Sequence, residues 1–515
     1  MSRLADLVDV SERVGAAPAR NAKVRELAQC LRGLAPAEVP PGVAYLSGEV
    51  PQGRCGVGPA ALRAARAVPA ADAPALSLAD VDRALADIAR LRGKGVAARR
   101  VAALEQLFVR ATVPERDFLV RLLLGDLRQG ALAGLMVEAI AEAAAVPVAD
   151  VRRAAMYAPD LGAVARAALD GTGAGFAGFR LEPLTPVAPM LAQTAATARE
   201  ALEQLGGEAA FEWKVDGARI QVHKSGGTVR IYSRNSNEVG AAIPEIVDTV
   251  RSWREAELIL DGEAVALDAA GRPHPFQVTM RRFGRRLDVE RLRAELPMHA
   301  LFFDCLRLGA ETLVERPARE RFAALASAVP DALCVPRLVT SSAAEAEAFY
   351  ARALAAGHEG VMAKALDAPY EAGNRGASWL KVKHAHTLDL VVLAAELGHG
   401  RRTGKLSNLH LGTLDPESGR YVMLGKTFKG LTDRTLEWQT RELLALETHR
   451  DAATVHVRPH LVVEIAFSDL QASTRYPGGI ALRLARVKRY RTDKRAEEAD
   501  TMATVRRLFA SQRAG

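Results

Sequence analysis

The sequence predicts a multidomain protein with an all-α N-terminal region, an α+β middle region and an all-β C-terminal region that suits a small barrel. In the first 180 residues or so, apolar residues recur at helical spacings of three and four, as in residues 118–123. The proline-rich stretch 182–189 cannot continue a helix. From residue 211 the apolar period changes to two, and from about residue 388 short candidate strands alternate with turns. We therefore expect domains at 1–180, 181–386 and 387–515.

Length and composition exclude several classes of protein. The 515 residues suffice for roughly three domains. Hydrophobic residues make up 49%, which is a globular rather than a disordered composition. No apolar run is long enough to span a bilayer, and the N-terminus does not resemble a secretory signal, so we expect no membrane segment and a cytoplasmic protein. The cysteines form no CxxC pair, which argues against zinc and fits a reducing compartment; they are Cys30, Cys55, Cys305 and Cys334.

The net charge indicates a polyanionic partner, and the scarcity of lysine relative to arginine indicates candidate catalytic residues. The net charge of +8 favours DNA, RNA or nucleotides as partners, although many basic proteins bind no nucleic acid. Only 12 of the 69 basic residues are lysines. A lysine can lose its proton and act as a nucleophile, whereas an arginine cannot. The sparse lysines are therefore candidates, although codon usage would explain any one of them; those of interest are Lys214, Lys364, Lys381 and Lys383.

The first motif is residues 212–217, EWKVDG. Strand alternation would place Glu212, Lys214 and Asp216 on one face. Such a segment can also be a solvated charge ladder, because an isolated KxDG recurs by chance in roughly a few per cent of chains of this size. The motif needs support from the rest of the sequence.

That support comes from four further motifs in order: residues 260–263 (LDGE), 302–304 (FFD), 359–364 (EGVMAK) and 379–383 (WLKVK). Chance agreement across five spaced motifs is negligible beside the single-motif odds. Together they resemble the covalent nucleotidyltransferase superfamily, and the whole set resembles an ATP-dependent DNA ligase of the three-domain type.

The resemblance extends beyond the middle region, to residues 125–130, 189–192, 405–412 and 482–487. It implies a helical DNA-binding domain at 1–180, an adenylation domain at 181–386 and an OB-fold domain at 387–515. Two places depart from the family pattern: residues 233–236 lack a usual glycine, and the expected Arg-Phe-Pro-Arg reads Arg-Leu-Ala-Arg, which keeps Arg483 and Arg486.

The activity that the resemblance implies is nick sealing in double-stranded DNA, during replication, repair or recombination, by a monomer associated with the nucleoid. ATP is the substrate and Mg²⁺ the metal. AMP passes from ATP to Lys214, then to the 5′-phosphate of the nick, and leaves when the 3′-hydroxyl attacks. Each step is an in-line displacement, so catalysis consists mainly of positioning and charge stabilisation.

The resemblance also implies a role for each matching residue: Glu212 reads the adenine amino group, Phe303 stacks on adenine, Arg219 and Glu263 hold the ribose region, Arg234 and Arg375 approach phosphates, Lys381 and Lys383 contact the α-phosphate, and Glu359 supports the metal. Other interpretations remain open from sequence alone. Phe303 would ordinarily be a core residue, Glu263 a surface carboxylate and Arg375 a loop cation, and the two lysines beside Val382 an exposed strand face.

The nucleophile must be neutral. A free lysine at pH 7 pays roughly 4.6 kcal/mol to lose its proton. Nearby cations such as Lys381, Lys383 and Arg219 would lower this cost, whereas the carboxylates of Glu212 and Asp216 would raise it. The sequence leaves this balance open.

Three rivals remain. An mRNA-capping guanylyltransferase or RNA ligase shares KxDG but does not account for the long helical N-terminal region. An NAD-dependent ligase is disfavoured by the missing four-cysteine cluster, and a catalytically dead nick-binding scaffold by the intact lysines. For the C-terminal region we expect Arg483 or Arg486, with Lys494, to swing over ATP in the first step, about a hinge near residues 384–388.

Overall fold

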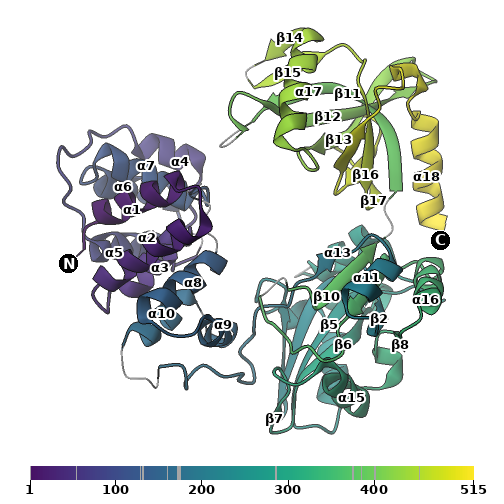
Figure 1. The fold of residues 1–515 in the computed structure, drawn as a ribbon, viewed down its shortest axis with the longest axis horizontal. Coiled ribbons are helices and arrows are strands. Elements are labelled where there is room, and N and C mark those ends of the chain that lie inside the picture. Colours follow the sequence, from purple (N-terminus) through teal and green to yellow (C-terminus); the bar gives the residue numbers. More distant parts are fainter. Residues whose placement is uncertain are drawn as a thin grey trace. The chain divides into compact units, whose positions relative to one another are not determined.

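The computed structural model describes residues 2–53, 55–127, 129, 133–158, 160–170, 175–284, 287–373, 376–383, 386–398, 402–451 and 453–514, with the main chain alone for 511–514. Its contacts divide the chain into two compact units, Met1–Ala188 and Pro189–Gly515 (Figure 1). No helix in these described residues is long and apolar enough to cross a membrane.

The first unit is helical, as predicted. Its helices bury their apolar faces in one shared core. Capping residues fix where helices begin: before α5, the Ser77 side chain accepts a hydrogen bond from the Asp80 amide at 3.1 Å, and the Asp80 carboxylate accepts one from the Ser77 amide. The helices are α1 (Leu4–Ala16), α2 (Arg20–Gly33), α3 (Val39–Leu46), α4 (Pro59–Ala65), α5 (Leu78–Arg90), α6 (Val96–Phe108), α7 (Val113–Leu123), α8 (Ala133–Ala144), α9 (Val148–Tyr157) and α10 (Leu161–Leu169).

The prolines that follow keep residues 175–192 free of helix and strand. Two sheets then build the first part of the second unit. One has the order β1-β10-β9-β2-β8, with β1 (Gln193–Thr194), β2 (Ala209–Trp213), β8 (Arg337–Thr340), β9 (Gly360–Lys364) and β10 (Trp379–Lys383). The other has the order β4-β3-β5-β6-β7, with β3 (Ala218–Ser225), β4 (Thr228–Ser233), β5 (Glu257–Ala266), β6 (Met298–Leu308) and β7 (Glu311–Thr312).

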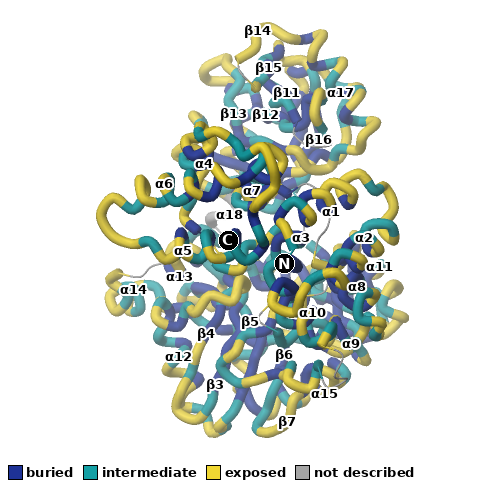
Figure 2. Tube along the Cα trace, turned by 90° about the vertical axis from the view of Figure 1, so that its left-hand side faces the viewer, coloured by how far each residue is buried: buried dark blue, intermediate teal, exposed yellow. Residues whose placement is uncertain are grey.

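Helices cover these sheets and leave β5 buried along almost all of its length (Figure 2). The α11 and α16 helices share a core with β2, β9 and β10, and the α12, α13 and α15 helices pack on the second sheet. In β2, Phe211 points into the helix-covered core, so that Glu212 points to the opposite side. The helices are α11 (Ala198–Gln204), α12 (Pro244–Arg251), α13 (Phe276–Phe283), α14 (Val289–Glu295) and α16 (Ala343–Ala355), with α15 (Ala318–Ala328) and short 3₁₀ turns at Gly240–Ala242 and Asp331–Leu333.

The C-terminal part is β-rich and antiparallel. One sheet holds β11 (His386–Leu397), β12 (Leu406–Asp415), β13 (Arg420–Thr427), β14 (Glu447–Asp451), β15 (Thr454–Val457), β16 (Val462–Phe467) and β19 (Arg486–Tyr490); β17 (Asp469–Ala472) pairs with β18 (Ile480–Arg483). The expectation of an all-β region was too strict, because α17 (Asp433–Ala445), α18 (Met502–Ala514) and a 3₁₀ turn at Ala496–Glu498 lie here too. α17 buries Leu436 and Leu443, and α18 buries Met502 and Val505.

Candidate active site

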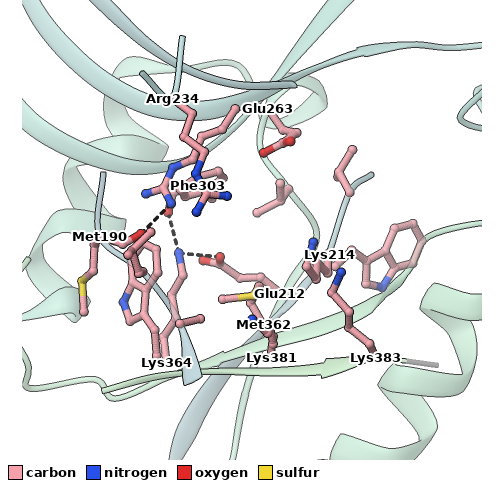
Figure 3. A pocket seen from close by; sticks show the side chains of 17 residues that line it. Met190, Glu212, Lys214, Arg234, Glu263, Phe303, Met362, Lys364, Lys381 and Lys383 are labelled. Carbon is pink, nitrogen blue, oxygen red and sulfur yellow. Dashed lines mark hydrogen bonds and ion pairs between the residues drawn. The ribbon is translucent and has the colours of Figure 1, made fainter. Parts of the chain in front are cut away.

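The predicted site residues meet in a cavity of about 230 Å³ in the second unit (Figure 3). Strands β2, β9 and β10 line it from one sheet, and β3, β5 and β6 from the other. The lining includes Glu212, Lys214, Arg219, Arg234, Glu263, Phe303, Lys381 and Lys383. Glu359 contacts two of these lysines, and Arg375 lies outside the described residues.

The segment that carries Lys214 departs from the predicted strand. Strand β2 ends at Trp213, and residues 214–217 follow as irregular chain. Lys214 nevertheless remains anchored, because its amide donates to Gly360 at 2.9 Å and its carbonyl accepts from Glu359 at 3.0 Å. A Cβ atom at Gly217 would overlap the Ala264 carbonyl, so the last position of the motif requires glycine.

Two lysines share one carboxylate beside the cavity. Glu359 forms ion pairs with Lys214 and with Lys383, whose Nζ lies 2.7 Å from Oε2 and 2.8 Å from Oε1. Burial alone would raise the pKa of Glu359, but the two ammonium groups lower it to about 2. Burial, followed by the charge of Lys214, lowers the pKa of Lys383.

The carboxylates around Lys214 decide whether its pKa is raised or lowered, a question that the sequence left open. Burial favours neutral Lys214, but Glu359, Glu263 and Asp216 outweigh it and raise the pKa of Lys214. Arg219 does not help to discharge it, since its guanidinium is bound to Asp261. Lys214 is therefore held protonated in the protein without substrate, and its activation requires that the surrounding negative charge be neutralised.

The acidic groups around Lys214 suit a hard cation. Burial, followed by the charge of Glu359, raises the pKa of Asp216, and burial raises the pKa of Glu263 to about 7. Within the described ranges, no group of three or more His, Cys, Asp or Glu side chains is placed to hold a metal on its own. One or two carboxylates completed by substrate phosphates are what Mg²⁺ takes in nucleotide sites. Glu359 thus fits Mg²⁺ together with a nucleotide.

Glu212, which also lines the cavity, is almost fully buried between two cations (Figure 3). Lys364, which is 1% exposed, lies 2.6 Å from Oε2, and Arg337 lies 2.6 Å from Oε1. Arg337 also donates to the carbonyl of Phe303 at 3.1 Å and stacks over Phe322 at 3.7 Å. Both oxygens of Glu212 are therefore fixed in position.

Aromatic rings line the cavity beside Lys364. Phe303 is half-buried at the cavity, whereas the adjacent Phe302 is fully buried in the core. The Phe303 and Trp379 rings meet edge to face with centroids 6.1 Å apart. The Lys364 ammonium lies 4.7 Å from the first centroid and 4.3 Å from the second.

Arg219 lines the cavity but is tied down. Its Nη2 lies 2.6 Å from Asp261 and its Nε 3.0 Å from the same carboxylate, and Nη2 also donates to Tyr370 at 3.2 Å. The Tyr370 hydroxyl in turn donates to Asp261 at 2.7 Å and accepts from the Met190 amide at 3.0 Å. This network joins the entry segment at Met190 to the second sheet.

Sequence reasoning missed Arg337, and it assigned no role to Lys364, Trp379 or Asp261. The scarcity of lysine and a place inside a motif pointed to Lys364. No sequence feature distinguishes Arg337 from the other 56 arginines. The two lysines beside Val382 line the cavity, so the interpretation as an exposed strand face was wrong.

A residue from the C-terminal part also reaches this site. Arg483 lies 2.7 Å from the Asp216 carboxylate, and its guanidinium is 3.8 Å from the Phe276 ring centroid. Lys494 is instead paired with Asp389 at 2.6 Å, within the C-terminal part. Arg486 is exposed. Of the three cations expected over the nucleotide, Arg483 alone has a described contact with the KxDG motif.

Comparison with known proteins agrees with this geometry. The chain matches three families, described as "DNA ligase N terminus" over residues 57–141, "ATP dependent DNA ligase domain" over 189–383 and "ATP dependent DNA ligase C terminal region" over 402–494. It is 60% identical over 512 residues to a probable DNA ligase of Anaeromyxobacter sp. (strain Fw109-5), covering 99% of this chain and 98% of that one. A probable DNA ligase of Sorangium cellulosum (strain So ce56) is 55% identical over 513 residues, covering 99% and 96%.

Among solved structures, one named "Pmar-Lig_PreS3" aligns with a TM-score of 0.62 at 19% identity, covering 94% of this chain and 99% of that one, which supports the fold alone. A cavity between two sheets, lined by a motif lysine and by a carboxylate held between two cations, fits a nucleotidyltransferase. The sequence relatives specify it further: the chain belongs to the ATP-dependent DNA ligases, which seal nicks in DNA through an adenylated intermediate.

Proposed function

We propose that Lys214 is the residue that carries AMP. The observation that carries this proposal is the position of its ammonium group in the cavity, beside Glu359 and Lys383. In the first step a bond forms between Nζ and the α-phosphorus of ATP, while the bond to the bridging oxygen breaks and pyrophosphate leaves. Nζ must lose its proton first, at a cost of at least roughly 4.6 kcal/mol at pH 7. The raised pKa of Lys214 adds to this cost.

The adenine lies, in this proposal, against Phe303, with its amino group donating to Glu212. Lys364 and Arg337 each pair with one oxygen of that carboxylate and hold it in place, so it accepts without reorganising. Arg219 and Glu263 hold the ribose side. Because Arg219 is fixed by Asp261, it contributes a rigid wall rather than a mobile contact.

The phosphates lie toward Lys381 and Lys383, with Arg234 at the rim. Arg375 belongs with them by resemblance. The two lysines on β10 share a face and would stabilise charge that grows on the α-phosphate oxygens in the transition state. As Lys383 moves from Glu359 to phosphate, its ion pair is exchanged and not lost.

Glu359 would hold Mg²⁺ together with the phosphates of ATP. The metal supplies charge neutralisation at the triphosphate. The carboxylates of Glu359, Glu263 and Asp216 would hold the Lys214 proton less strongly when a bound cation offsets their negative charge. This accounts for a nucleophilic lysine among carboxylates.

We further propose that the first unit supplies affinity for nicked duplex DNA and that the C-terminal part is an OB-fold. The arginine-rich helices and the match to the ligase N terminus support the first assignment. Antiparallel strands with turns at short intervals support the second. We propose boundaries at residues 180 and 386, a monomer, and a location in the cytoplasm with the nucleoid, where its substrate lies.

We also propose that the C-terminal part serves the first step. Lys494, now paired with Asp389, would turn over the triphosphate, and Arg483 would leave Asp216. Deletion after residue 387 should then reduce adenylation by ATP more than closure of a pre-adenylated nick. Intact adenylation with lost closure would show that this part is only a DNA grip.

The experiment that tests the central proposal is incubation with labelled ATP, GTP or NAD⁺, followed by denaturing electrophoresis and peptide mapping. ATP alone should label the protein, on the peptide that contains Lys214, through an acid-labile bond. Labelling by GTP would favour a capping-type transferase, and a label on another peptide would place the nucleophile elsewhere. A chain lacking residues 1–180 should still be labelled but seal nicks poorly.

A further inference from the structure

A second cavity lies in the C-terminal part, between the first turns of α17 and strand β19. Its volume is about 400 Å³, within the range of small-ligand sites. Its lining residues come from 430–438 and 487–492, and none of them lines the adenylation cavity. Strand β19 pairs with β16 on one side, so its other side borders this cavity rather than another strand of the sheet.

Two aromatic rings form a fixed platform in this cavity. The centroids of Trp438 and Tyr490 are 4.6 Å apart, and the rings meet edge to face. The Tyr490 hydroxyl donates to Gln439 at 2.8 Å, and the Gln439 amide donates to the Leu406 carbonyl. Because these bonds hold Tyr490 against Trp438, a ligand that stacks here would order little more of the protein.

The cavity is also positively charged. Arg434, Lys488 and Arg489 line it, and its lining contains no carboxylate. Glu464, outside the lining, pairs with Arg489 at 2.7 Å and Lys488 at 3.5 Å. Arg434 lies in the first turn of α17, where the helix dipole disfavours a cation, and no acidic partner of Arg434 appears among the described ion pairs. An anion bound here would relieve that unfavourable charge.

We propose that this cavity binds one unpaired nucleotide of single-stranded DNA, with the base on the Trp438–Tyr490 platform and a flanking phosphate on Arg434. Arginine recognises phosphate through paired N–H donors, and aromatic faces accept any base. An acidic peptide would use the cations but leave the platform without a planar partner. The site adds to nick sealing a grip on a single-stranded tail or gap beside the junction.

Photo-cross-linking tests the location. The full-length protein is irradiated with an oligothymidine that carries one 5-iodouracil, and the adduct is mapped by mass spectrometry. The expected adduct is on the peptide that contains Trp438 or on the one that contains Tyr490. Adducts confined to the first unit or to other strands would overturn the proposal.

Fluorescence anisotropy with labelled oligothymidine tests the energetics. Trp438→Leu should raise the Kd about tenfold, because it removes the stacking surface. Arg434→Gln should reduce the slope of log K against log salt by about 0.7, the value for one phosphate contact on a single strand. Arg434 is at the surface, so this variant separates binding from folding, and thermal unfolding checks the folding of Trp438→Leu.

Arg441→Gln is the matched control. It lies on the same helix, outside the cavity, beside its neighbour Glu442 at 3.4 Å. Its Kd and salt slope should stay at the wild-type values. Equal losses in control and test variants would show non-specific electrostatics and overturn the proposal. Competition by polyglutamate as effective as that by unlabelled oligothymidine would assign the cavity to acidic peptides instead.

Discussion

Two buried ion clusters of the second unit differ in the cation that they use. Arg321 and Asp304 are both fully buried, with N–O distances of 2.7 and 3.1 Å, and Arg321 also donates to the carbonyls of Arg316 and Ala368. Around Glu359, two lysines share one carboxylate, and their side chains remain 21% and 26% exposed. The arginine pair is saturated and permanent, whereas the lysine cluster leaves protons and contacts that a substrate can exchange.

This difference suggests why lysine is rare in an arginine-dominated chain: lysine is used where a proton or contact must be exchanged. The arginine cluster joins α15 to β6 and to the Ala368 carbonyl, and has no freedom to do chemistry. The lysine cluster lines the cavity, and its two ammonium groups share the carboxylate of Glu359. Four predictions test whether arginine serves structure and lysine serves chemistry in this domain, from the largest expected effect to the smallest.

Replacing Lys214 by arginine keeps the positive charge but removes the amine that can lose its proton and attack. Lys214→Arg should lower adenylate formation by on the order of a thousandfold, because arginine holds its proton about three pH units more tightly. The measurement is single-turnover labelling with ATP. Circular dichroism should show an unchanged fold. Labelling at the wild-type rate would exclude Lys214 as the nucleophile.

Breaking the arginine cluster should affect stability instead. Arg321→Met leaves Asp304 charged and unpaired in the core, which should cost roughly 3–5 kcal/mol of unfolding free energy. Urea denaturation measures it. Arg316→Met, in an exposed pair with Glu311 at 3.2 Å, is the control and should change stability by about 1 kcal/mol or less. A similar loss in both variants would contradict the comparison.

Arg337 is an arginine that acts at the cavity, because it holds Glu212, the proposed adenine-binding group, in position. Arg337→Met removes one of the two cations on Glu212 and should raise the KM for ATP in adenylation about tenfold, with little change in kcat. Arg337→Lys should restore most of the affinity. A fall in kcat at constant KM would show instead that Arg337 acts on the reaction itself.

The last prediction concerns pH. The pKa of Lys214 is raised, and only its neutral form reacts, so at constant subsaturating ATP the rate should rise about tenfold per pH unit below that pKa. Glu359→Gln removes the carboxylate that raises this pKa most. Its profile should therefore level off at a lower pH than that of the wild type, whatever its absolute rate. Superimposable profiles would show that Glu359 does not control the proton.

Much of the site followed from the sequence because its parts are local. Motifs of three to six residues identified Glu212, Lys214, Glu263 and Phe303 from their neighbours along the chain, and all four line one cavity. Helical periodicity predicted the helical first unit. Strand periodicity did not predict that β2 stops at Trp213, because its end depends on the bonds that Lys214 makes with Gly360 and Glu359.

The sequence by itself determined the order of the motifs, the change from helical to strand periodicity and the rarity of lysine, since each is a property of neighbours along the chain. The tertiary structure alone decided the sign of the Lys214 pKa shift, the clamp of Arg337 on Glu212 and the network of Arg219 with Asp261 and Tyr370. These depend on distances between residues from 42 to 151 positions apart. Burial strengthens each interaction, and burial is decided only when the sheets close around the cavity.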